Sequence, residues 1–230
     1  MIPIQDTVQS RGIPLVTWGI ILLNGLVFLY EVSLPPEDLE LLFLHLGMTP
    51  ARLGVDPDAY WTVLTSMFLH GDWLHFVGNM WMLYLFGDNV EDRIGSVRYL
   101  VFYLVCGLAA EAAHIATDPT SPVPTLGASG AIAGVMGAYF LMFPTARVIT
   151  LVPVFIIPFL FEIPAVFFLG LWFLTQLWSG TLSLVGPTAY GGIAWWAHIG
   201  GFVAGVALVY LFRQPRKRRR GYYADEYWPW

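Results

Sequence analysis

Ser129 combines a nucleophilic side chain with a place in the chain where it could act. It follows a proline-rich segment, residues 118–124, and a glycine-containing stretch, residues 125–128. So many prolines prevent a helix, and we therefore expect a loop that turns into a helix near Ser129. The free amides at a helix N-terminus could hold the oxyanion that forms when a serine hydroxyl attacks a carbonyl carbon. A serine that only caps the helix is the alternative interpretation.

Two other segments carry polar side chains within apolar sequence. His75 and Asn79 are four residues apart, so they share one face of a helix, about 6 Å apart along its axis. Both offer hydrogen-bond donors to the interior of a helix bundle, where the alternative role is to hold helices together. His198 stands in a third apolar segment, where it could be a packing partner, a ligand or a proton relay.

Small residues recur on the segments of Ser129 and His198 in a pattern that favours close helix contact. They are Gly130, Gly134 and Gly137 in the first segment, and Ala197, Gly201 and Gly205 in the second. Such small faces allow two helix backbones to approach closely. If the loop 117–128 dips inward, Ser129 reaches the depth of the two histidines and Asn79. The sequence therefore predicts a nucleophile, a base and oxyanion donors in one pocket.

The composition indicates what kind of protein holds these residues. The chain has 230 residues, of which 57% are hydrophobic and 12% are charged, and its net charge is −5. A soluble domain has about 25% charged residues, so a water-facing shell is hard to build from this sequence. The single cysteine, Cys106, excludes a disulfide scaffold, and the composition argues against disorder or nucleic-acid binding. A multi-pass membrane protein remains.

Uncharged stretches predict an all-α fold with six membrane-spanning helices. We expect these helices at residues 13–32, 73–89, 97–116, 129–143, 163–179 and 192–212. The fourth is short, and we expect a re-entrant loop before it, because its ends must then meet protein or water rather than lipid. Residues 33–72 are too broken to cross and are expected at the membrane interface. Residues 148–161 contain Pro153 and Pro158 and are expected to form an irregular interfacial lead-in to the fifth helix.

The basic residues predict how these helices are oriented. Six of the eleven lie between Arg213 and Arg220, after the last helix, so the C-terminus is expected in the cytoplasm. Six crossings then place the N-terminus inside as well, with Arg52 the one basic residue outside. We divide the chain into a short cytoplasmic N-terminus (1–12), a membrane domain (13–212) and a cytoplasmic basic and aromatic tail (213–230). The short soluble regions favour a bacterial plasma membrane, with the pocket opening to the outer side.

Three motifs in this order resemble the rhomboid family of intramembrane serine proteases. They are His70 with His75 and Asn79, then Gly127-Ala-Ser129-Gly130, then Ala197-His198 with Gly201 and Gly205. The resemblance covers roughly residues 55–212 and implies a six-helix rhomboid bundle. It also implies that the substrates are transmembrane proteins, cut within or next to their membrane-spanning segments.

The resemblance also implies a role for each residue of the predicted pocket. Ser129 matches the nucleophile and His198 the general base of a Ser–His dyad. Asn79 and His75 match positions that stabilise the oxyanion, together with the Ser129 backbone amide. Gly127 matches the residue just before the catalytic turn.

Other intramembrane chemistries fit the residues less well. A metalloprotease needs a His-Glu-x-x-His motif, which is absent, and an aspartyl protease needs two intramembrane aspartates. We therefore expect no metal and no cofactor. No Asp or Glu lies in residues 129–143 or 192–212, so we expect helix packing to orient His198. The alternatives are a catalytically silent rhomboid-like binder of membrane proteins and a transporter, which should show inverted repeats.

Overall fold

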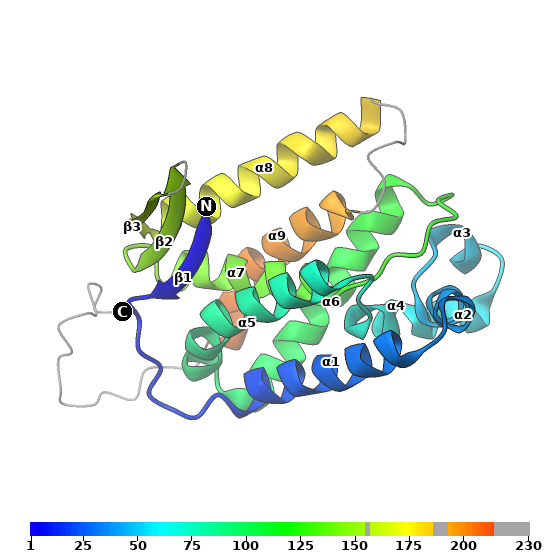
Figure 1. The fold of residues 1–230 in the computed structure, drawn as a ribbon, viewed down its shortest axis with the longest axis horizontal. Helices are drawn as coiled ribbons and strands as arrows, with labels where there is room; N and C mark the ends of the chain where they lie inside the picture. The colour runs from blue at the N-terminus through cyan, green and yellow to red at the C-terminus, as the bar shows by residue number, and fades with distance from the viewer. Residues whose placement is uncertain (155–156, 186–192, 214–230) are drawn as a thin grey trace.

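The computed structural model describes residues 1–154, 157–185 and 193–213, which form a helical bundle with a small sheet at one end (Figure 1). Four of the described helices are long and apolar enough to cross a membrane. They are α1 (Leu15–Ser33), α6 (Ser96–Thr117), α8 (Ala165–Val185) and α9 (Trp195–Phe212). No more than 33% of each apolar window is buried inside the protein, so most of these side chains face outward, as lipid contact requires.

Two further helices, α5 (Trp73–Ile94) and α7 (Ser129–Met142), lie where the second and fourth helices were predicted. The last turns of α5 carry charged residues, at Asp88, Glu91, Asp92 and Arg93. α7 has 14 residues, or about 21 Å, whereas the hydrocarbon core of a bilayer is about 30 Å thick. Each of the six predicted segments therefore contains a helix. The largest difference in length is at α5, which has 22 residues because it continues to Ile94, and α8 also runs past its predicted end, to Val185.

Short helices form the connection between α1 and α5. They are α2 (Pro36–Leu46), α3 (Pro50–Leu53) and α4 (Thr62–Thr65), with 3₁₀ turns at Pro57–Trp61 and Ser66–Phe68. Met48 in this connection exchanges two backbone hydrogen bonds, of 3.2 and 2.7 Å, with Thr125 in the loop before α7. The connection therefore holds the entry to α7, at the end of the bundle away from the sheet (Figure 1).

The sheet has three antiparallel strands in the order β1-β2-β3. They are β1 (Ile2–Asp6), β2 (Arg147–Val154) and β3 (Ile157–Pro164). The expectation of an irregular chain over residues 148–161 is wrong. Pro153 pairs with Pro158 one position from the end of the β2–β3 pairing, and Pro164 ends β3, so these prolines cost the sheet little. The prediction of an all-α fold is right for the bundle and misses this sheet.

A buried carboxyl group attaches the N-terminal strand to the bundle. Residues 1–12, the predicted short cytoplasmic N-terminus, contain β1, which pairs with β2 and brings Asp6 to α5 and α7. Asp6 Oδ2 accepts hydrogen bonds from the Tyr139 hydroxyl at 2.5 Å and from Asn89 Nδ2 at 2.9 Å. Burial raises the pKa of Asp6 to about 7, because the charged carboxylate loses its hydration there.

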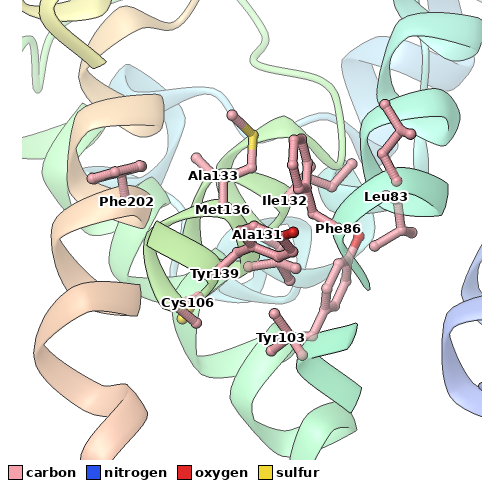
Figure 2. Packing of buried hydrophobic residues seen from close by; sticks show 14 of the residues in the cluster. Leu83, Phe86, Tyr103, Cys106, Ala131, Ile132, Ala133, Met136, Tyr139 and Phe202 are labelled. Carbon is pink, nitrogen blue, oxygen red and sulfur yellow. The ribbon is translucent and has the colours of Figure 1, made fainter. Parts of the chain in front are cut away.

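α7 is the innermost helix of the bundle. Every residue from Gly130 to Tyr139 is buried. Figure 2 shows the side chains of α7 at the centre, with Phe202 of α9 on one side and Leu83 and Phe86 of α5 on the other. Other helices thus surround α7 over most of its length, which accounts for its being shorter than a lipid-exposed span.

The backbones of α7 and α9 are in direct contact. A Cβ on Gly201 would collide with the carbonyl oxygen of Gly130, and a Cβ on Gly205 would collide with that of Gly134. Only glycine leaves room for these contacts, so the two glycine strips set the separation of the helices.

Candidate active site

The turn before α7 determines where Ser129 lies. Gly127 has a φ of +122°, which favours glycine, and its amide N–H donates to the carbonyl of Ser66 at 2.9 Å. Ala128 is the N-cap residue, and Ser129 is the first residue of the helix. The Ser129 side chain therefore does not cap α7, and its hydroxyl is directed to another helix.

The Ser129 hydroxyl and the His198 imidazole are hydrogen-bonded. Ser129 Oγ lies 2.8 Å from His198 Nε2, although the two residues are 69 positions apart in the sequence. His198 is in the first turn of α9, and the glycine contact holds this turn beside the start of α7. Both residues are half-buried, so the helices enclose them without covering them fully. The structure thus brings together the two residues that the sequence suggested as nucleophile and base.

The other ring nitrogen of His198 bonds to a residue that the sequence analysis missed. His198 Nδ1 lies 2.8 Å from Oε1 of Gln176, a buried residue of α8. We expected helix packing to orient His198, and the structure adds a side-chain amide to the groups around its ring. A signal was present, since Gln176 is the one amide side chain in α8 and a polar group in an apolar span is a functional candidate.

His75 and Asn79 lie on α5 and face the backbone of Gly127. A Cβ on Gly127 would be 2.6 Å from His75 Nε2 and 3.6 Å from Asn79 Nδ2. Asp72 caps this helix by accepting a hydrogen bond from the His75 backbone N–H at 2.8 Å. Within the described ranges, the buried Nδ2 of Asn79 has no hydrogen-bond partner. An unpaired buried donor costs about 1–3 kcal/mol, so this group is a candidate to bind a ligand atom.

His70, the first residue of the predicted motif, lies just before α5 and is enclosed by other rings. Its ring centroid lies 5.1 Å from that of His75 and 6.3 Å from that of Phe28. Burial lowers the pKa of His70 to about 4, so the ring is neutral at neutral pH and packs as an aromatic group. In the part of the chain that the structure describes, no group of three or more His, Cys, Asp or Glu side chains could hold a metal ion.

Comparison with known proteins assigns the family. A family model described as the Rhomboid domain matches residues 57–215, which is more than half of the chain. The chain belongs to the rhomboid family. The matched region of this rhomboid contains Ser129, His198 and Gln176, and also His75 and Asn79 of α5.

Three relatives show how this rhomboid compares with named proteins. It is 32% identical to YdcA of Bacillus subtilis (strain 168) over 132 residues, which are 57% of this chain and 64% of YdcA. It is 35% identical to the rhomboid protease GluP of the same organism over 135 residues, 58% of this chain and 26% of GluP. It is 33% identical to RHOMBOID-like protein 5 of Arabidopsis thaliana over 93 residues, 40% of this chain and 30% of that protein. The chain thus spans less than two thirds of the length of each.

Family membership and the apolar helices together define the class of the protein. It is an integral membrane protein of a family that contains intramembrane proteases. Whether this rhomboid itself cleaves peptide bonds depends on the chemistry that Ser129, His198 and their neighbours can perform.

Proposed function

We propose that this rhomboid is a serine endopeptidase that cuts peptide bonds within or next to the transmembrane segments of membrane proteins. The observation that carries the proposal is the 2.8 Å hydrogen bond between Ser129 Oγ and His198 Nε2. A serine hydroxyl is a weak nucleophile at its free pKa and needs an adjacent base. In this proposal Ser129 is the nucleophile and His198 is the general base.

The proposed reaction has two halves. Ser129 Oγ attacks the scissile carbonyl carbon while its proton moves to His198 Nε2, and the carbonyl oxygen becomes an oxyanion. When this intermediate collapses, the C–N bond breaks and His198 gives the proton to the leaving amine. Water then attacks the acyl-enzyme, with His198 taking its proton. The second collapse releases the carboxylic acid, and the proton returns to Ser129 Oγ.

We assign the oxyanion donors to the groups around Gly127. The unpaired Nδ2 of Asn79 supports this assignment, as does the position of the Ser129 amide at the start of α7. His75 is the third proposed donor, through Nε2. A glycine at position 127 suits this role, because a Cβ there would be 2.6 Å from His75 Nε2 and would occupy the space that the substrate carbonyl needs.

We also propose that the six helices α1, α5, α6, α7, α8 and α9 cross or enter the membrane, with a re-entrant loop at residues 117–128. The pairing of β1 with β2 supports this topology. Four of the six proposed membrane helices, α1, α5, α6 and α7, lie between these strands, and an even number of crossings returns the chain to the same side. The sheet is at the C-terminal end of α7, whereas Ser129 is at its N-terminal end. If residues 1–12 are cytoplasmic, as the basic residues suggest, the site opens to the outer side. The predicted tail, 213–230, lies outside the described residues from 214 onward.

In this proposal α8 moves to admit a substrate sideways from the lipid. α8 runs along the outside of the bundle (Figure 1) and has no charged residues. The second gating element of this proposal is the connection from α8 to α9, whose residues 186–192 lie outside the described ranges. A covalent link between α8 and α5 that leaves cleavage unchanged would contradict a gating role.

A covalent probe tests the function directly. Purified protein in detergent is treated with a fluorophosphonate, which reacts with activated serines. We expect labelling at Ser129, and no labelling of the Ser129→Ala or His198→Ala variants. A silent rhomboid-like binder, the alternative function, would bind transmembrane segments without being labelled. Substrate cleavage by Ser129→Ala at the wild-type rate would refute the assignment of Ser129 as the nucleophile.

A further inference from the structure

A buried amide in α8 makes hydrogen bonds with both ends of its side chain. Gln176 is 6% exposed. Its Nε2 lies 3.2 Å from the carbonyl oxygen of Trp172 and 3.1 Å from Thr175 Oγ1, and its Oε1 lies 2.8 Å from His198 Nδ1. No part of the proposed reaction uses these bonds, so they need their own explanation.

The partners of Gln176 determine which end of the amide faces His198. The Trp172 carbonyl can only accept hydrogen bonds, so the group next to it must be the NH₂ end. Thr175 donates its own hydroxyl proton to that same carbonyl, at 2.6 Å, which leaves Thr175 Oγ1 as an acceptor for Gln176. The amide oxygen must therefore face His198.

This orientation also determines which nitrogen of His198 carries the proton. An amide oxygen only accepts hydrogen bonds, so His198 Nδ1 must be protonated to bond with it. In a neutral imidazole the other nitrogen, Nε2, then has its lone pair free, and it faces the Ser129 hydroxyl at 2.8 Å. A general base needs this tautomer, because Nε2 must accept the serine proton.

We infer that Gln176 is a positioning residue that holds His198 in the tautomer and orientation required of the base. The inference rests on the proposed function, since it gives Gln176 the part that an aspartate has in a Ser-His-Asp triad. The amide differs from an aspartate in being uncharged, so it selects the tautomer without a full counter-charge for the imidazolium. The uncharged side chains of Ser129 on α7, His198 on α9 and Gln176 on α8 are therefore joined by hydrogen bonds in that order.

The first test removes the acceptor and measures how fast the base activates Ser129. Gln176→Met keeps the length of the side chain and lacks the amide oxygen. We expect the maximal rate of Ser129 labelling by a fluorophosphonate to fall about 10- to 100-fold, the loss typical when the hydrogen-bond partner of a metal-binding histidine is removed. The probe concentration for half-maximal rate should stay the same, because the probe's own contacts are unchanged. Gln176→Glu, which keeps an acceptor oxygen, should recover most of the rate.

Asn24 in α1 provides a matched control. Its Nδ2 donates to the carbonyl of Ile20, four residues earlier, as Gln176 does to Trp172. Asn24 is fully buried, and in the described chain its Oδ1 has no partner. Asn24→Leu therefore removes a buried helix amide without touching the dyad, and the labelling rate should stay at the wild-type value.

The second test observes the tautomer itself. In protein labelled with ¹⁵N at histidine, the two ring nitrogens of His198 are identified by their loss in His198→Ala. We expect a protonated Nδ1 in the wild-type protein and a mixture of tautomers in Gln176→Met. If Gln176→Met does not fold, Gln176→Leu and Gln176→Glu are measured in the same way.

The outcomes separate this inference from the proposed function. A wild-type labelling rate and an unchanged Nδ1 proton in Gln176→Met would overturn the inference, even if Ser129→Ala is inactive. Labelling of Ser129→Ala would instead overturn the proposed function. A reduced rate in Gln176→Met that Gln176→Glu does not recover, with an unchanged tautomer, would show that Gln176 only supports packing.

Discussion

The two neighbours of α9 hold it in different ways. Towards α7 the contact is main chain against main chain, with Gly201 and Gly205 next to carbonyl groups. Towards α8 it is made by aromatic side chains, since the ring of Phe202 stacks on Phe173 with centroids 4.6 Å apart and lies 6.0 Å from Trp172. Rings can slide or rotate, whereas main-chain atoms in contact can only be pushed apart. The contact between α9 and α7, which sets the distance from His198 to Ser129, is therefore fixed. The contact between α9 and α8, which sets the distance from His198 to Gln176, is adjustable.

The largest effect should come from breaking the glycine contact. Gly205→Ala places a methyl group against the Gly134 carbonyl and forces the two backbones apart. A misplacement of about 1 Å can cost 10²-fold in rate, so we expect cleavage and probe labelling to fall about 10²-fold or more. The thermal unfolding temperature, followed by tryptophan fluorescence, should fall as well.

Gly19 in α1 provides the control for this substitution. A Cβ on Gly19 would have no atom within 4 Å, so Gly19→Ala adds the same methyl group without a collision. It should retain the wild-type rate. If Gly205→Ala also retains it, the glycine contact does not set the distance between Ser129 and His198.

A smaller effect is expected on the aromatic side of α9. Phe173→Ala removes the stacked pair with Phe202, and such a pair is worth about 0.5–1.5 kcal/mol. Gln176 still joins α8 to His198, so the labelling rate should fall by no more than about tenfold, which corresponds to 1.4 kcal/mol. A loss as large as that of Gly205→Ala would remove the difference between the two contacts.

The smallest effect on activity is expected at the sheet, far from both faces of α9. The pKa of Asp6 is about 7 in the folded protein and 3.8 as its reference value, so the folded state holds a proton that the unfolded state releases. The stabilisation of the folded state by this bound proton is complete below pH 3.8 and is lost as the pH rises through about 7. We expect a lower unfolding temperature at pH 8 than at pH 6 for the wild type, and a smaller difference for Asp6→Asn. An equal difference in both proteins would exclude Asp6 as the titrating group.

The helices and most of the site were predictable because their signals are local. Apolar runs indicated the six helices, and the prolines before Gly127 indicated a helix start at Ser129. The small-residue spacing on α7 and α9 was enough to predict that Ser129 and His198 meet. That all six helices cross the bilayer stays a prediction, because α5 and α7 differ from the four that have the length and hydropathy of a span.

The contacts that the sequence did not indicate join segments that no local pattern relates. Gln176 is 22 positions before His198, and its role depends on how α8 returns to pack on α9. β1 pairs Ile2 with Leu151, so its register depends on how the seven helices between the two strands, α1 to α7, fold. The prolines of the β2–β3 hairpin also opposed a strand prediction, since the pairing of Pro153 with Pro158 is visible only once the strands are aligned.

The pairing of β1 with β2 has a consequence for biosynthesis. β1 leaves the ribosome before α1, but its partner strand follows α7 in the chain. The edge that β1 joins therefore does not exist until the first four long helices have been made and delivered to the membrane. Asp6 and Tyr139 can bond only after that, so closure of the sheet is a late event that fastens helices already inserted.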